Sequence, residues 1–225
     1  MKTILIIPAF NEEDSIESVV GNIRDNYPQF DYVVVNDGSH DSTADVCRKN
    51  GFRFLDLPIN LGLSGAFQAG LKYAYKHDYD CAVQFDADGQ HLPEYVQVLV
   101  DRISAHDIVI GSRFVTQEKP SSMRMLGSNL ISWMIKVTTG QRINDPTSGM
   151  RAYNRRMIKA LAFGPNLGPE PDTISYLIKK KHAKVCEVQV DMANRMAGES
   201  YLNMRRSAAY MAHVFFSVLF VQWFR

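Results

Sequence analysis

Cysteine is scarce in this 225-residue sequence. The three cysteines are Cys47, Cys81 and Cys186, and none of them lies in a Cys-x-x-Cys pair or at a spacing typical of metal ligands. A small, odd number of unclustered cysteines excludes a disulfide framework and a cysteine-based zinc site. Each cysteine falls in a segment predicted as an apolar helix or strand. We therefore expect buried, reduced thiols in a cytosolic protein.

The sequence also lacks an excess of one charge, because it contains 25 Lys and Arg residues and 24 Asp and Glu residues, for a net charge of +1. This balance argues against a nucleic-acid partner. The charges are unevenly placed: residues 1–118 hold 9 basic and 18 acidic residues (balance −9), and residues 119–225 hold 16 and 6 (balance +10). The split favours a front half that holds cations and a back half that meets phosphate or a membrane surface. A chance drift of surface charge is the alternative.

Uncharged segments of 18 residues are absent until residues 207–224, which are flanked by Arg206 and Arg225. This length is at the lower limit for a membrane-spanning helix, and three polar side chains in it weaken that interpretation further. We expect an interfacial helix lying in the plane of a membrane. A helix buried in the domain or in an oligomer interface, and a true span, are the alternatives.

The rest of the sequence contains no repeat and no low-complexity linker. Residues 1–10 combine a lysine with a short apolar run but lack a signal-peptide cleavage site, so they are predicted as a buried strand. The sequence therefore predicts one domain, residues 1–205, followed by an apolar helix in residues 206–225.

Short apolar runs alternate with helical patterns along the first half of the chain, which predicts a doubly wound, mostly parallel α/β sheet flanked by helices. The expected strands are Thr3–Pro8, Tyr32–Val35, Arg53–Leu57, Cys81–Phe85 and Asp107–Ile110. The expected helices between them are Ser15–Asn26 (capped by Asp14), Asp41–Asn50, Ser64–His77 and Pro93–Ala105. Later elements are expected at Met123–Thr139, Met150–Tyr153, Arg155–Phe163, a helix ending at Lys181, and Lys184–Met192.

Polar clusters follow four of these strands. They are Phe10-Asn11-Glu12, Asn36-Asp37-Gly38-Ser39, Asn60 and Asp86-Ala87-Asp88. Ligands of doubly wound sheets bind beyond the carboxyl ends of the strands, so these clusters predict a single active-site rim. The sequence contains neither a Gly-x-Gly-x-x-Gly fingerprint after the first strand nor a Gly-x₄-Gly-Lys-Ser/Thr loop, which argues against a dinucleotide or P-loop site.

The strongest candidate for metal binding follows the fourth strand. Asp86, Asp88 and Gln90 are two residues apart, and in an extended backbone such side chains point to the same side. Carboxylate and carbonyl oxygens suit Mg²⁺ or Mn²⁺. An acidic turn without a metal is the alternative. Asp37 is a candidate for contacting a ribose or a base, and the alternative there is a turn in which Asp41 or Ser42 caps the next helix.

Five motifs in order and spacing resemble family 2 glycosyltransferases of the GT-A fold, closest to the dolichyl- or polyprenyl-phosphate mannosyl- and glucosyltransferases. They are Pro8-Ala9-Phe10-Asn11-Glu12, Asn36–Asp41, Asn60-Leu61-Gly62, Asp86–His91 and Gly111-Ser112-Arg113. Asp145–Arg151 is similar to the family's acceptor loop, with Met150 in place of the usual Phe. Arg195–Ser200 is similar to a segment that closes on the donor diphosphate, with Tyr201 where a Lys often follows.

The resemblance implies a UDP- or GDP-linked sugar donor, a divalent ion (Mg²⁺ or Mn²⁺) on Asp86, Asp88 and Gln90, and a polyprenyl phosphate acceptor of the dolichyl or undecaprenyl type. The implied donor-binding residues are Pro8, Ala9, Phe10, Asn11, Glu12, Asp37, Gly65, Asp86, Ala87, Asp88 and Arg195. The implied acceptor-binding residues are Arg113, Arg124, Ser148 and Arg151, and the implied catalytic residues are Asp88, Asp145 and Arg195.

These inferences combine into one expected function: inverting, metal-dependent transfer of a sugar to a polyprenyl phosphate by a protein peripheral on the inner face of the cell membrane. A phosphate acceptor is a ready nucleophile and needs cations, which arginine supplies well. A hydroxyl acceptor on a glycan or protein needs a general base, for which Asp145 is the candidate. A non-catalytic nucleotide-sugar-binding subunit is a third hypothesis. Homo-oligomerisation through the C-terminal helix stays open.

Overall fold

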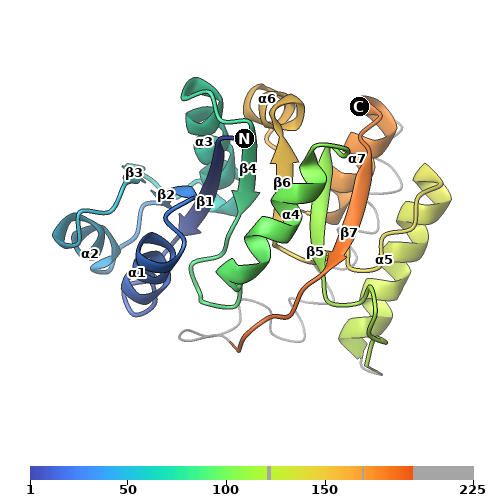
Figure 1. Ribbon diagram of the computed structural model, residues 1–225, viewed down its shortest axis with the longest axis horizontal. Helices are drawn as coiled ribbons and strands as arrows, with labels where there is room; N and C mark the ends of the chain where they lie inside the picture. The colour runs from blue at the N-terminus through green and yellow to red at the C-terminus, as the bar shows by residue number, and fades with distance from the viewer. Residues whose placement is uncertain (121–122, 169, 195–225) are drawn as a thin grey trace.

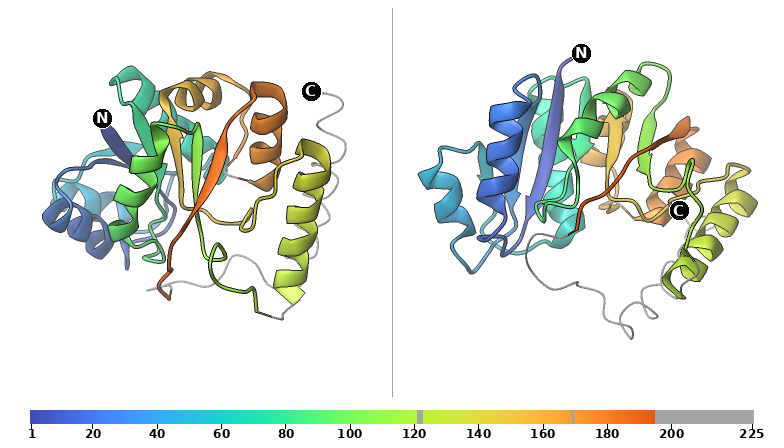
Figure 2. Two further views of the ribbon diagram at one scale, coloured as in Figure 1. Left: turned by 45° about the vertical axis from the view of Figure 1, so that its right-hand side comes forward. Right: turned by 60° about the horizontal axis from the view of Figure 1, so that its bottom comes forward.

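The computed structural model describes residues 1–120, 123–168 and 170–194. These residues form a seven-stranded sheet between two layers of helices (Figures 1 and 2). The expectations for Arg195, for the segment 195–200 and for the apolar helix 206–225 lie outside the described residues.

The sheet has the order β3-β2-β1-β4-β6-β5-β7. Every strand runs parallel to its neighbours except β6, which is antiparallel to both β4 and β5. The strands are β1 (Thr3–Ala9), β2 (Asp31–Asn36), β3 (Phe54–Asp56), β4 (Cys81–Gln84), β5 (Ile108–Ser112), β6 (Arg151–Asn154) and β7 (Val185–Gln189). The predicted mostly parallel α/β sheet is confirmed, and the reversed direction of β6 is an addition to it.

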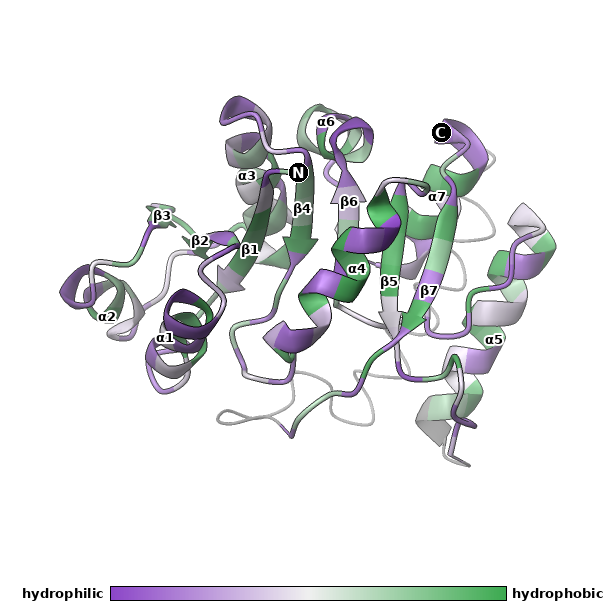
Figure 3. Cartoon of the chain, in the orientation of Figure 1, coloured by the Kyte–Doolittle hydropathy of each residue, from purple (hydrophilic) through white to green (hydrophobic). Residues whose placement is uncertain are grey.

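The two faces of the sheet are covered by different helices, and alternate residues of β1 show the division. Ile4 and Ile6 pack in one buried cluster with residues of α3, α5, α6 and α7, and Leu5 and Ile7 pack in the other with residues of α1, α2 and α4. In Figure 3 the strands β4 and β5 are coloured largely as hydrophobic, whereas β6 is coloured as hydrophilic. The helices are α1 (Ile16–Asn26), α2 (Thr43–Lys49), α3 (Gly62–Lys76), η1 (Pro93–Tyr95), α4 (Val96–Ile103), α5 (Met123–Thr139), α6 (Arg155–Phe163) and α7 (Pro171–Lys181).

Details of two helix starts differ from or refine the sequence-based expectation. Ser15, not Asp14, occupies the N-cap position of α1. At the start of α2 the carboxylate of Asp41 accepts hydrogen bonds from the backbone N–H and the hydroxyl of Thr43, so Asp41 supplies the polar contact although Ser42 holds the cap position. Both helix starts lie at the carboxyl edge of the sheet, and Asp41 also accepts a hydrogen bond from the backbone N–H of Glu13 in the loop after β1.

Among the described residues, no helix combines the length and the apolar character that crossing a membrane requires.

Gly70 gives a test of how tightly α3 packs on the sheet. A Cβ atom at this position would lie 2.2 Å from Cγ2 of Ile6, which is fully buried in β1. We expect Gly70→Ala to lower the free energy of unfolding by about 1–3 kcal/mol, because the helix must move away from the strand. Gly21→Ala in α1 is the matched control, since nothing lies within 4 Å of its Cβ position. Helix propensity alone gives that variant a gain of up to about 1 kcal/mol. Urea denaturation measures both, and a loss of equal size in the two variants would contradict the packing argument.

Candidate active site at the carboxyl edge of the sheet

The loops after β1 and β2 are joined by reciprocal hydrogen bonds. The backbone N–H of Asn11 donates to Oγ of Ser39 at 3.0 Å, and Oδ1 of Asn11 accepts from the N–H of His40 at 2.9 Å. Asn11 has a positive φ of 55°, a conformation that asparagine tolerates better than most residues. The rings of Phe10 and His40 meet edge to face. The two predicted polar clusters therefore form one wall of the rim.

Asp37 connects this wall to the start of α3. Its carboxylate is 3% exposed and accepts a hydrogen bond from the backbone N–H of Leu61 at 2.7 Å. Burial raises the pKa of Asp37, and the hydrogen bonds from the N–H groups of Leu61 and Gly62 partly oppose that rise. Gly38 next to it has a positive φ and lies against the backbone of Ile59 and Asn60, where a Cβ would collide. Asp37 thus links the loop after β2 to the loop after β3.

The loop after β4 is organised around His91. Its imidazole is buried, meets the ring of Phe85 edge to face and accepts at Nδ1 a hydrogen bond from the backbone N–H of Asp86 at 2.9 Å. Its Nε2 lies 3.5 Å from Oδ2 of Asp86. Because Nδ1 accepts, the proton of the neutral ring is assigned to Nε2, which faces the carboxylate. One side chain therefore fixes both the backbone and the carboxylate of Asp86.

Asp88 stabilises the same loop by a hydrogen bond to its backbone. It is 5% exposed, and its Oδ1 accepts a hydrogen bond from the backbone N–H of Gln90 at 3.0 Å. The carbonyl of Gln90 accepts from the N–H of Ala193, and His91 pairs with Met192 in an isolated antiparallel bridge. The loop after β4 is consequently bound to the chain that leaves β7.

The carboxylates of Asp86 and Asp88 fit a metal site that is completed by the phosphates of a substrate. No group of three or more His, Cys, Asp or Glu side chains in the described part of the chain is arranged to hold an ion. A closed protein cage is therefore not formed there. Mg²⁺ is usually held by one or two carboxylates together with substrate phosphates, and Asp86, whose side chain is 35% exposed at the rim, suits that arrangement.

Gly149 brings the acceptor-loop motif against this carboxylate. A Cβ built on Gly149 would lie 3.0 Å from Oδ2 of Asp86 and 3.3 Å from Cε1 of His91. The approach follows from β6, which runs between β4 and β5 and pairs Arg151 with Gln84 and with Ile110. Residues 145–149 therefore enter the sheet at the rim where β4 ends.

Arg113 and Asp145 form the best-defined ion pair of the rim. Nε and Nη2 of Arg113 donate to the two carboxylate oxygens of Asp145 at 2.7 and 2.9 Å, and Asp145 is fully buried. Below it, Glu187 of β7 accepts the backbone N–H groups of Asn144 and Asp145 at 2.7 and 2.8 Å. The side chain of Gln189 accepts from the N–H groups of Val115 and Thr116. β7 thereby positions both partners of the pair.

Two predicted acceptor-binding residues are used inside the protein. The guanidinium of Arg151 is fully buried and donates to the carbonyls of Pro146, Ser148 and Glu170. Ser148 is 1% exposed, and its hydroxyl donates to the carbonyl of Gly111. The structure therefore places both side chains in the support of the 145–149 loop rather than on a free surface. Both side chains are buried because β6 runs through the middle of the sheet, between β4 and β5. The direction of β6 was not predicted from the sequence.

A cavity of about 400 Å³ lies beside the Arg113–Asp145 pair, between the chain after β5, helix α5 and the loop after α5. Its basic side chains are Lys119, which is half-buried, and Arg142, which is exposed. Nζ of Lys119 donates to Oγ of Ser128 and lies 5.4 Å from the centre of the Phe114 ring. Burial lowers the pKa of Lys119, and the nearby carboxylates of Asp145 and Glu187 oppose that shift. The cavity lining therefore holds two cations, Lys119 and Arg142, against one exposed carboxylate, that of Glu118.

The remaining predicted residues have simpler placements. Pro8 and Ala9 end β1, Ala87 is buried between the two aspartates, and Glu12 donates its backbone N–H to the hydroxyl of Thr43. Gly65 lies in the first turn of α3, where a Cβ would meet that of Leu61 at 2.4 Å, so its described role is packing. The side chain of Arg124 and all of Arg195 lie outside the described residues.

Sequence reasoning missed several residues that shape the site: Gly149 as a close contact, Glu187, Gln189, Lys119 and Arg142. The sequence did contain a signal for Glu187 and Gln189, because both lie within the otherwise apolar strand β7. Polar side chains on a strand of a buried sheet need hydrogen-bond partners. His91 contacts Asp86 and thereby supports the loop after β4.

Comparison with known proteins gives a family and a set of relatives. Residues 4–162 match the sequence model described as glycosyl transferase family 2. The chain is 30% identical over 220 residues to an undecaprenyl-phosphate mannosyltransferase of Micrococcus luteus, covering 90% of this chain and 88% of that protein. It is 31% identical over 170 residues to a polyprenol monophosphomannose synthase of Mycolicibacterium smegmatis, covering 71% of this chain and 64% of that protein.

The fold has a solved counterpart. The structure of glucosyl-3-phosphoglycerate synthase from Mycobacterium tuberculosis in complex with Mn²⁺, uridine diphosphate and phosphoglyceric acid superposes with a TM-score of 0.71. The match covers 97% of this chain and 77% of that chain at 21% sequence identity. At this identity the similarity establishes a shared GT-A architecture.

Glu187 gives a test of how the Arg113–Asp145 pair is positioned. Glu187→Gln replaces one acceptor oxygen by an NH₂ group that faces a backbone N–H. We expect a loss of about 1–3 kcal/mol in the free energy of unfolding, because a buried donor loses its charged acceptor. Glu94→Gln in the exposed η1 turn is the matched control and should change stability by less than about 0.5 kcal/mol. If urea denaturation finds the two variants equally stable, Glu187 does not hold the loop.

Proposed function

Since the chain belongs to glycosyl transferase family 2, and is therefore a nucleotide-sugar-dependent glycosyltransferase, we propose that it transfers one sugar from a UDP- or GDP-linked donor to a polyprenyl phosphate. The observation that carries the proposal is the placement of two opposite charge environments on one rim. The carboxylates of Asp86 and Asp88 follow β4, and Lys119 and Arg142 line the cavity beyond the end of β5, next to the Arg113–Asp145 pair.

On the donor side, Asp86 and Asp88, with Gln90, are proposed to hold Mg²⁺ or Mn²⁺ together with the donor diphosphate. When bound, such an ion stabilises the negative charge that develops on the departing nucleoside diphosphate. His91 fixes the carboxylate of Asp86 in place, and the loops after β1 and β2, from Pro8 to Glu12 and at Asp37, form the wall for the nucleoside. Arg195 is proposed to add a second cation at the diphosphate.

On the acceptor side, a phosphate oxygen is proposed to attack the anomeric carbon directly. The new bond joins that carbon to the acceptor oxygen, and the bond to the diphosphate breaks on the opposite side, so the configuration is inverted. An ionised phosphate needs no general base. Asp145 supports this choice, because it is fully buried and both of its oxygens accept hydrogen bonds from Arg113, which leaves it poorly placed to take a proton from a hydroxyl.

Lys119 and Arg142 favour an anionic acceptor over a neutral sugar. They line the same cavity next to the ion pair, and a doubly charged phosphate gains most where two cations are available in a partly desolvated site. Arg124 is proposed to join them. The relatives from Micrococcus luteus and Mycolicibacterium smegmatis are described as transferases to undecaprenyl phosphate and polyprenol phosphate, which supports a lipid carrier here.

The lipid acceptor implies a place of action. We propose that the catalytic domain spans residues 1–205 and works on the inner face of the cell membrane, with residues 206–225 as an apolar, interfacial segment. The uncharged run 207–224 between arginines supports this division. Self-association through that segment is part of the same proposal.

A direct assay tests the proposed transfer. The purified chain is incubated with radiolabelled UDP- or GDP-sugars, Mn²⁺ and polyprenyl phosphate, and label is counted in the organic phase. We expect lipid-extractable label that is lost on chelation of the metal and reduced about 100-fold to 1,000-fold in Asp88→Ala, since removing one electrostatic partner of the developing charge costs that much. Circular dichroism should show Asp88→Ala folded.

The other outcomes separate the alternatives. Label on a water-soluble glycan or protein that disappears in Asp145→Asn would favour a hydroxyl acceptor. A nucleotide-dependent rise in melting temperature without turnover for any donor would favour a binding subunit. Either result would overturn the proposed transfer to a lipid phosphate.

Gly149→Ala tests the contact on which Asp86 depends. Its new Cβ presses on Oδ2 of Asp86 at 3.0 Å, so the carboxylate must shift by a few tenths of an ångström. We expect the transfer rate to fall by about tenfold to 100-fold, because misplacing a positioned group by less than 1 Å is costly. Stability should change by less than about 1 kcal/mol. Gly21→Ala serves as the control and should keep full activity. Normal turnover in Gly149→Ala would show that Asp86 need not hold this position.

A further inference from the structure

Helix α5 presents an apolar stripe to solvent. Leu126, Leu130, Trp133 and Val137 are 62%, 44%, 59% and 63% exposed. Their spacing of four, three and four residues places them on one side of the helix. The opposite side holds Ile131, Met134 and Ile135, which are buried against the rest of the protein. α5 is thus apolar on two sides, and only one of them is covered by the described residues.

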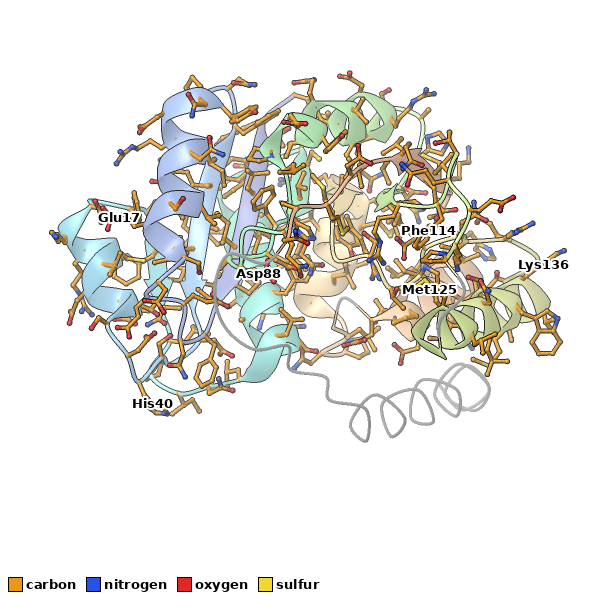
Figure 4. All side chains as sticks on the ribbon, turned by 90° about the horizontal axis from the view of Figure 1, so that it is seen from below. Glu17, His40, Asp88, Phe114, Met125 and Lys136 are labelled. Carbon is orange, nitrogen blue, oxygen red and sulfur yellow. The ribbon has the colours of Figure 1, made fainter. Side chains whose placement is uncertain are left out.

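Basic side chains lie near this stripe, and one acidic residue, Glu118, lines the neighbouring cavity with them. Helix α5 contains no Asp or Glu, and Lys136 beside the stripe is exposed. Asn129 and Ser132, the sequence neighbours of Leu130 and Trp133, line the cavity that holds Lys119 and Arg142. In Figure 4 α5 lies along one border of the face that carries Asp88, and Lys136 points outward from it. The stripe and the basic cavity therefore adjoin one another.

We propose that the α5 stripe, defined as Leu126, Leu130, Trp133 and Val137, docks in the surface of an anionic lipid bilayer. A helix that carries apolar side chains with a tryptophan, contains no Asp or Glu and has Lys beside the apolar stripe has the composition of helices that lie in a membrane interface. A second copy of the chain would bring the same positive charges together, which opposes a symmetric pairing of this face.

Docking by this stripe would set the cavity at the level of the lipid headgroups. The stripe extends over about 16 Å of helix, from Leu126 to Val137. Lys119 and Arg142 then face anionic headgroups, each adding attraction of short range. This link to the acceptor rests on the proposed function, whereas the docking itself does not.

The two tryptophans of the chain, Trp133 and Trp223, make the proposal directly measurable. Full-length Trp223→Phe keeps Trp133 as its only indole. We expect its fluorescence to be quenched by iodide in solution. On addition of vesicles of equimolar phosphatidylcholine and phosphatidylglycerol, emission should move to shorter wavelength and brominated acyl chains should quench it. Unchanged Trp133 emission on vesicles would overturn the proposal, even if the chain sediments with them. Shielding from iodide before lipid is added would also overturn it, because the chain itself or a second copy would then cover the stripe.

A matched pair of substitutions controls for loss of apolar surface. Val137→Ser in the stripe should weaken vesicle partitioning about tenfold, since one buried valine side chain is lost from the interface. Val98→Ser is the control, because Val98 is also exposed (44%) but lies on α4, which covers the opposite face of the sheet. Equal partitioning of the two variants would overturn the assignment to α5. Lipid binding through Trp133 without sugar transfer would disprove the proposed function and leave the docking surface in place.

Discussion

The close approach of Gly149 to Asp86 and His91 is the constraint on which the site depends. It joins the loop after β4 to the loop before β6, which are about sixty residues apart in the chain. His91 sits between them, buried against Phe85, and holds the backbone and carboxylate of Asp86. Because no side chain can stand at position 149 without moving that carboxylate, the position of the Asp86 carboxylate is fixed by backbone contact. The antiparallel course of β6 is what makes this contact reachable.

A second set of contacts separates charges of opposite sign across the rim. Asp145 neutralises Arg113 in a bidentate pair, and Glu187 below it binds backbone amides. Lys119 and Arg142 remain as the cations of the neighbouring cavity. In the proposed function, donor and acceptor are both anionic at their reacting ends, so a single basic cleft would attract both without distinction. Carboxylates at the end of β4 and cations beyond the end of β5 would give each substrate its own region.

Much of the fold could be predicted from the sequence because its signals are local. Alternating apolar strands and amphipathic helices predict the α/β sheet, and polar clusters after each strand predict the rim. The direction of β6 has no such signal. A strand of four residues shows the same sequence pattern whether it runs parallel or antiparallel to its neighbours. Arg151 and Ser148 were expected to bind the acceptor, whereas the structure buries both side chains in the support of residues 145–149. Glu187 and Lys119 depend on contacts between distant segments, which residue type and spacing do not reveal.

The position of β6 also affects how the protein is made. In the order of synthesis β1, β2, β3 and β4 emerge first, and each parallel pair among them can form from the chain already present. The inner strand β4 nevertheless has an open edge until residues 151–154 leave the ribosome. Its sequence, Cys-Ala-Val-Gln, is short and apolar, and an uncovered edge of that kind invites pairing with other chains. A nascent chain halted before β6 would accordingly be a client for chaperones.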